Sequence, residues 1–204
     1  MTQGVMAISC VGVCGCMALG QSFVVSASAP AFVLPGQQFN VDVWGSVSGA
    51  PWTQGVSAMA AFQVNLLGSG PIAQASNIVH GSLSGGATGS IVGVDAIGVS
   101  GFQLPNFAGA NPSIDLSNPI LLYSIVVDAG ALGTITYTPS VGLPGQTLAF
   151  YPDATQFATI QVLPPLGGLP TLSLLGVSVQ VIPSAGGASA AVLLLGGAAA
   201  RRRR

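Results

Sequence analysis

The alternation of apolar and polar residues through the middle of the chain predicts β-strands. Phe39, Val41 and Val43 recur at every second position, a period of two that places one face of a strand against a core. The same alternation marks residues 62–66, and residues 120–127 form a continuous, β-branched apolar run that suits a central strand. Further strands are expected at residues 22–27, 78–80, 91–99, 134–138, 157–162 and 175–181.

Glycine, proline and serine separate these expected strands. Pro35 and Gly36 have the chemistry of a turn, and residues 45–55 and 81–90 are predicted to be loops, the second of them flexible. No segment between residues 21 and 182 shows an amphipathic helical period with caps. Short strands at regular spacing therefore predict an all-β fold, an antiparallel two-sheet sandwich.

Ionisable side chains are scarce between residues 21 and 182. This part of the chain has no lysine, arginine or glutamate, and His80 is its only titratable base. Without a basic patch, a nucleic-acid partner is excluded. At about 160 residues the segment is long enough to bury a core without disulfides. Its acidic residues are Asp42, Asp95, Asp115, Asp128 and Asp153.

This inventory argues against catalysis and against a cofactor. A Ser-His-Asp triad would have to use His80, and no Gly-x-Ser-x-Gly elbow occurs. No spacing pairs two aspartates for glycoside hydrolysis, and one histidine without cysteine makes no transition-metal site. Calcium stays open, because aspartates are hard oxygen donors, although no Asp-x-Asp-x-Asp run is present. We expect a protein that is not an enzyme.

Aromatic residues offer the one candidate ligand contact. Rings in a sandwich either pack in the core or form a platform on which a sugar stacks. Trp52, in the polar loop 51–54, is the best candidate for an exposed, stacking ring. The other rings considered are Trp44, Tyr123, Tyr137 and Tyr151.

Residues 1–20 have the features of a signal peptide. An apolar stretch covers residues 5–19, and Ala18 and Gly20 are small residues of the kind a signal peptidase reads. The alternative is a buried N-terminal helix. Under the signal-peptide interpretation all three cysteines of the chain leave with residues 1–20, because they are Cys10, Cys14 and Cys16.

The last part of the chain joins an apolar run to a cationic block. Residues 185–200 carry no charge, and as a helix they would rise about 24 Å against a hydrocarbon core of about 30 Å, so they suit a transient membrane anchor. A basic block after an apolar run holds the following end in the cytoplasm. The block consists of Arg201, Arg202, Arg203 and Arg204, the only lysine or arginine residues in the chain.

The C-terminal arrangement resembles the PEP-CTERM sorting signal, which has a short proline motif, an apolar helix and an arginine-rich end. The resemblance implies that an exosortase-like enzyme cuts near the motif and that the protein is released to the cell surface or its exopolysaccharide. Where the family has Pro-Glu-Pro, this chain has one proline and no glutamate; the alternative is a plain tail anchor. The motif consists of Val181, Ile182, Pro183 and Ser184. The expected organisation is a signal peptide at 1–20, a sandwich at 21–182 and a sorting segment at 183–204.

Four stretches of the middle segment also resemble the cohesin-like fold, the nine-stranded sandwich of cellulosomal scaffolds and related carbohydrate-binding modules. They are residues 35–43, 61–66, 77–81 and 121–127. This resemblance implies about nine strands and a glycan or a dockerin-type protein as partner. Two functions therefore stay open. One is a non-catalytic protein of the cell surface or extracellular matrix, and the other is a binding module with a defined ligand.

Overall fold

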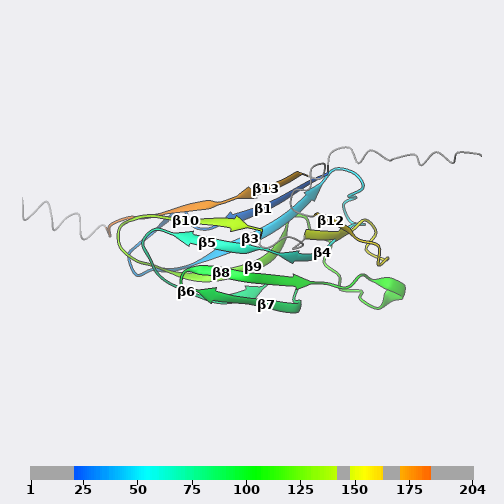
Figure 1. Ribbon diagram of the computed structural model, residues 1–204, viewed down its shortest axis with the longest axis horizontal. Helices are drawn as coiled ribbons and strands as arrows, with labels where there is room; N and C mark the ends of the chain where they lie inside the picture. Colours follow the sequence, from blue (N-terminus) through cyan, green and yellow to red (C-terminus); the bar gives the residue numbers. More distant parts are fainter. Residues whose placement is uncertain (1–20, 142–147, 163–170, 185–204) are drawn as a thin grey trace, which may run out of the picture.

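The computed structural model describes residues 21–141, 148–162 and 171–184, which form two β-sheets packed face to face (Figure 1). The predicted signal helix and the predicted apolar C-terminal helix lie outside these residues. Within the described ranges, no helix is long and apolar enough to cross a membrane. The all-β class and the two-sheet sandwich predicted from the hydrophobic alternation are confirmed.

The smaller sheet has five strands in the order β13-β1-β3-β9-β6. Its centre is the antiparallel pair β3 and β9, which joins Gln38 to Asp128 at one end and Gly45 to Ile120 at the other, with a shift of register between Val43 and Trp44. The continuous apolar run of the sequence therefore lies in a central strand, as predicted. The bounds are β1 (Ser22–Ser28), β3 (Gln38–Ser48), β6 (Ile72–His80), β9 (Ile120–Ala129) and β13 (Thr171–Leu175).

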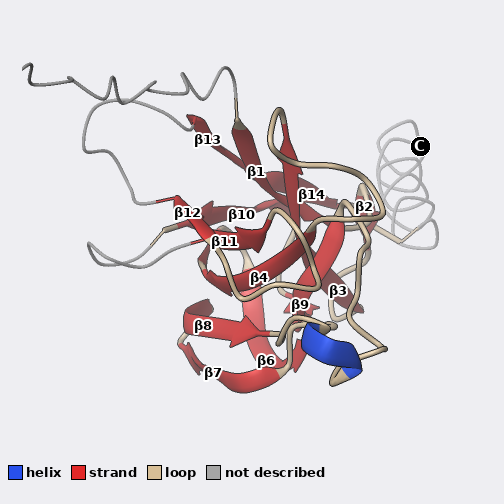
Figure 2. Ribbon diagram, turned by 90° about the vertical axis from the view of Figure 1, so that its right-hand side faces the viewer, coloured by secondary structure: helices blue, strands red, loops and turns tan. Residues whose placement is uncertain are grey.

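The larger sheet has nine strands, eight of them in the order β12-β11-β4-β8-β5-β10-β14-β2, with β7 paired to β8. The bounds are β2 (Phe32–Val33), β4 (Ala58–Gln63), β5 (Asn65–Ser69), β7 (Gly85–Val92), β8 (Asp95–Phe102), β10 (Gly133–Ser140), β11 (Leu148–Tyr151), β12 (Ile160–Val162) and β14 (Val177–Val181). A single 3-10 turn, η1 (Phe107–Gly109), is the one helical element of the described residues and is blue in Figure 2.

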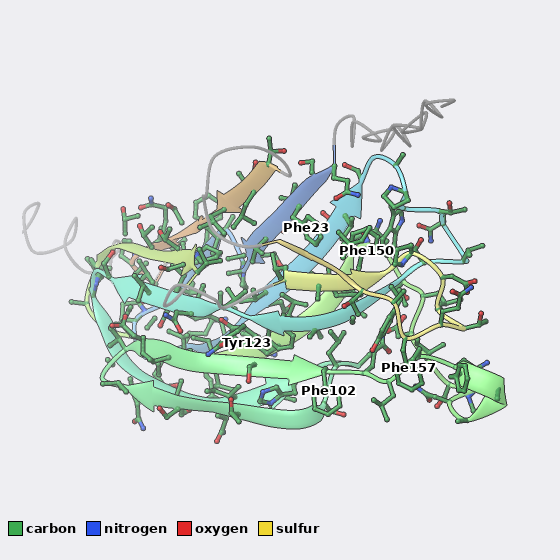
Figure 3. The ribbon with its side chains drawn as sticks, turned by 45° about the vertical axis from the view of Figure 1, so that its right-hand side comes forward. Phe23, Phe102, Tyr123, Phe150 and Phe157 are labelled. Atoms are coloured by element: carbon green, nitrogen blue, oxygen red, sulfur yellow. The ribbon has the colours of Figure 1, made fainter. Side chains whose placement is uncertain are left out.

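Aromatic side chains from both sheets meet between the layers. Tyr123 of β9 is fully buried and stacks on Phe62 of β4, with ring centroids 5.9 Å apart. Its hydroxyl donates a hydrogen bond of 3.1 Å to the Val64 carbonyl. Phe23 of β1 packs against Phe150 of β11 at 5.6 Å, and Figure 3 shows these rings between the sheets. The core thus ties the two layers together along their length.

Strand number and pairing differ from the prediction. The described residues contain fourteen strands rather than about nine, and two pairings, β1 with β13 and β14 with β2, are parallel. Residues 62–66 belong to two strands, because the strand is interrupted at Val64. The Val64 amide donates a hydrogen bond of 2.9 Å to the Val99 carbonyl. Both halves still pair with β8.

The segment predicted to be a flexible loop, residues 81–90, is mostly strand. From Gly85 onward it forms β7, which makes a hairpin with β8, so the single strand expected at residues 91–99 is divided by a turn. Gly93 has a φ of +64° in this turn, a conformation that favours glycine. The glycine and serine content suggested a loop, but the pairing to β8 outweighs local propensity.

Candidate functional site

The proline motif begins inside the sandwich and ends outside it. Val181 is buried at the end of β14, between β10 and β2, and the Ile182 amide donates to the Val33 carbonyl at 2.9 Å. Pro183 and Ser184 follow and are exposed. Proline has no amide hydrogen with which to extend the ladder. The hydrogen-bonded structure therefore stops at Ile182, and the arginine block lies outside the described residues.

The first described residue, Gln21, is already joined to the sandwich. Gln21 is buried, its carbonyl accepts a hydrogen bond from the Thr171 amide (3.1 Å), and β1 starts at the next residue. β1 starts toward one end of the long axis and β14 finishes toward the other (Figure 1). The two predicted processing sites thus adjoin the first and last strands, at opposite ends of the molecule.

Trp52 is half-buried rather than exposed. Its ring packs against Phe150 with centroids 5.5 Å apart, and its Nε1 is buried without a hydrogen-bond partner in the described structure. The loop folds inward there because the Trp52 amide donates to the Gly49 carbonyl at 3.0 Å. One face of the ring is therefore taken by the core. Ligand stacking at Trp52 stays a prediction.

The other four rings considered for stacking belong to the fold. The Trp44 Nε1 donates to the Ser28 hydroxyl at 3.1 Å, and Tyr123, Tyr137 and Tyr151 are buried. Burial raises the pKa of all three tyrosines, and for Tyr137 the Asp95 carboxylate raises it further. The three tyrosines therefore build the core, whereas Trp44 is half-buried at an outward-facing position of β3.

The aspartates are spread over the sandwich and make separate local contacts. Asp42 accepts a hydrogen bond from Ser124 (2.6 Å), Asp95 from the Gly68 amide (2.7 Å) and Asp128 from Gln38 (3.0 Å). Among the residues the structure describes, no three histidine, cysteine or acidic side chains come together as a metal-binding group. Calcium binding gains no support from this arrangement.

His80 connects the edges of the two sheets. Its Nε2 lies 3.0 Å from the Thr88 carbonyl of β7, and its ring lies 6.4 Å from that of Phe62. Because β6 and β7 belong to different sheets, this contact joins the layers at their open side. The geometry gives His80 a structural role.

Two aspartates carry hydrogen bonds that favour the ionised form. At Asp115 burial raises the pKa, but hydrogen bonds from Ser117 and Ser82 outweigh it and hold the pKa below its ordinary value. At the exposed Asp153, hydrogen bonds from Thr155 and Gln156 likewise lower the pKa. Both groups therefore stabilise the fold only while they are ionised.

We expect the free energy of unfolding to change little from pH 7 to pH 5 and to fall only below the ordinary aspartate pKa of 3.8. The folded-state pKa values are depressed, so the stabilisation is present above 3.8 and is lost as pH falls toward the folded values. Urea unfolding across this pH range measures the free energy of unfolding. Asp115→Asn is the control, and its free energy of unfolding should fall less at acid pH. A steep loss between pH 7 and pH 5 would contradict this and point to a buried aspartate held by an ion.

Exposed aromatic side chains, which the sequence reasoning missed, gather at one end of the sandwich. Phe107 of η1 and Phe157 form a tilted pair with centroids 5.3 Å apart, and they are 53% and 60% exposed. Their loops are joined by a hydrogen bond of 2.7 Å from the Asn106 amide to the Ala154 carbonyl. Phe107 lies among loop residues outside any strand alternation, whereas Phe157 stands in the strand expected at residues 157–162, which begins only at Ile160.

Comparisons of this chain with protein-family models and with curated proteins give no match. The function is therefore argued from the geometry and from the residues themselves.

Proposed function

We propose that this chain is a non-catalytic exported protein of the cell surface or extracellular matrix, sorted by an exosortase-type C-terminal signal. The observation that carries the proposal is the position of the motif. The sandwich closes at Ile182, and Pro183 and Ser184 stand exposed directly after the last strand. A sorting enzyme can reach such a segment without unfolding the sheet.

The sequence around the motif fits this order of events. The uncharged run at residues 185–200 would hold the chain in the membrane, and the arginines after it would keep the end from crossing. The motif would then be held at the outer face of the membrane, joined to a sandwich that is already folded. An exposed proline motif between a closed domain and a membrane stop would be accessible to such an enzyme.

The alternative is a binding module for a glycan or a dockerin-type protein, and one observation favours it. η1, with Phe107, lies at the end of the long axis opposite to the one where β14 finishes (Figure 1). A protein held by its C-terminal tail would present this aromatic end away from the membrane. Exposed rings at the outermost point of a surface protein suit recognition.

The intact mass of the protein recovered from the cells that make it tests the proposal, because one value reports both cuts. A mass lacking both predicted segments supports export and sorting, and the mass of the whole chain contradicts them.

A further inference from the structure

On the outer face of the larger sheet, the exposed ring of Phe102 lies against two glycines of β7. Alternation along β8 turns Gly101 toward the core, where a Cβ would meet Phe62, and turns Phe102 outward, 42% exposed. A Cβ on Gly86 would come within 2.6 Å of the Phe102 ring, and one on Gly85 within 2.9 Å. Glycine at both positions therefore lets the ring lie against the backbone of β7.

Two shallow hollows lie on either side of the Phe102 ring. The larger, of about 370 Å³, is lined by the side chains of Ser82, Ser84 and Asn111 besides the ring. The smaller, of about 200 Å³, continues past Phe102 toward Gln63 and Ser100. Small-ligand sites have volumes of roughly 300–1,000 Å³. Figure 3 shows Phe102 where β8 ends, on the part of the molecule that also carries Phe157. We call these two hollows with their shared ring the Phe102 groove.

Side-chain hydrogen bonds hold the wall of the Phe102 groove in place. The Gln103 side-chain amide donates to the Met59 carbonyl at 2.7 Å and to the Asp115 carbonyl at 2.9 Å. The Asn111 side-chain amide donates to the Leu104 carbonyl at 2.7 Å. The loop after β8 is thereby fixed to β4, so little ordering remains to be done when a ligand binds.

The chemistry of the groove selects a neutral, hydroxyl-rich ligand. The described residues include no lysine or arginine, so an acidic polysaccharide finds no cation to pair with. The one carboxylate beside the groove, on Asp115, already accepts hydrogen bonds from the Ser82 hydroxyl and the Ser117 amide. What remains is a ring whose electron-rich face attracts C–H groups, with hydroxyl and amide groups around it.

We propose that the Phe102 groove binds a neutral polysaccharide, one sugar ring stacking on Phe102 and its neighbours lying in the two hollows. Both hollows have Phe102 in their lining, so a chain that occupies both would cross the ring. The proposal rests on the binding-module alternative above and names its ligand class and its site. It differs from the Trp52 prediction, because the Trp52 ring is packed against the core.

The test uses the full chain in polyoxyethylene-ether micelles, since detergents with sugar head groups would compete. Affinity electrophoresis measures retardation in gels containing dextran, xylan, galactomannan or mixed-linkage β-glucan, with alginate as the anionic comparison. We expect retardation by at least one neutral polymer and not by alginate. Phe102→Leu, which keeps apolar bulk but removes the ring, is expected to weaken binding about tenfold, as for one lost ring contact. Phe102→Trp should keep it.

Phe32→Leu is the matched control, because Phe32 of β2 is also exposed but lies outside the groove and outside the Phe107–Phe157 pair; it should bind like the parent. Should Phe102→Leu fail to fold, Ser84→Arg fills the larger hollow without touching the core and should abolish retardation. Equal binding by Phe102→Leu and the parent, retardation by alginate alone, or no retardation in any gel would overturn the proposal. These results are independent of the intact mass, so failure of the site is distinguishable from failure of export.

Discussion

Replacing the four terminal arginines, residues 201–204, by serine is expected to move the protein from the cell fraction to the medium with its tail uncut. Each arginine costs about 2.5 to 3.5 kcal/mol to place in the centre of a membrane on insertion scales. Four together stop the chain, whereas the short apolar run alone holds only marginally. Fractionation and immunoblotting of cells and medium measure the change.

A quadruple lysine variant at residues 201–204 is the matched control, because it keeps the positive charge and should be processed like the parent. If the serine variant stays with the cells and is cut like the parent, the arginines are not the stop. The sorting signal would then lose its main physical support.

Tyr123→Ala is expected to cost about 3–5 kcal/mol of the free energy of unfolding, the range for removing a large buried aromatic side chain. The side chain is fully buried and stacks on Phe62 across the two sheets, so its loss leaves a cavity between the layers. It would also leave the Val64 carbonyl without the hydroxyl that donates to it. Urea unfolding of the parent and the variant measures the difference.

Tyr123→Phe separates the two contributions, because it keeps the ring and removes only the hydrogen bond. It should cost about 0.5–1.5 kcal/mol. Burial raises the pKa of Tyr123 above its ordinary 10.0, so its stabilising effect is present below pH 10 and is lost as pH rises further. Tyr123→Phe should therefore weaken the alkaline loss of stability. A Tyr123→Ala variant within about 1 kcal/mol of the parent would contradict the core described above.

The sequence predicted those elements whose alternation is strong. β3 and β9 follow from their apolar periodicity. Strands β2, β11 and most of β13 were missed, because two to five residues are too short for a period to be read. β7 was missed because its glycines and serines are typical of a loop. Only its pairing with β8 makes it a strand.

Candidate contacts were harder to predict than strands, because exposure depends on which loop covers which ring. Trp52 lies in a polar loop, yet that loop folds back onto Phe150. Phe102 ends an apolar run that suggests a core position, yet alternation from Gly101 turns it outward. Periodicity assigns a face within one strand, but it does not show which strands lie beside it.

The intact mass of the protein recovered from its own cells tests the central claim most directly. Export and sorting predict a chain that begins near Gln21, ends near Pro183 and lacks every cysteine and every arginine of the sequence. Any group left by the sorting enzyme would appear as an added mass at the new C-terminus. A mass of 20.1 kDa, that of the whole chain, would contradict both cuts and the proposed function with them.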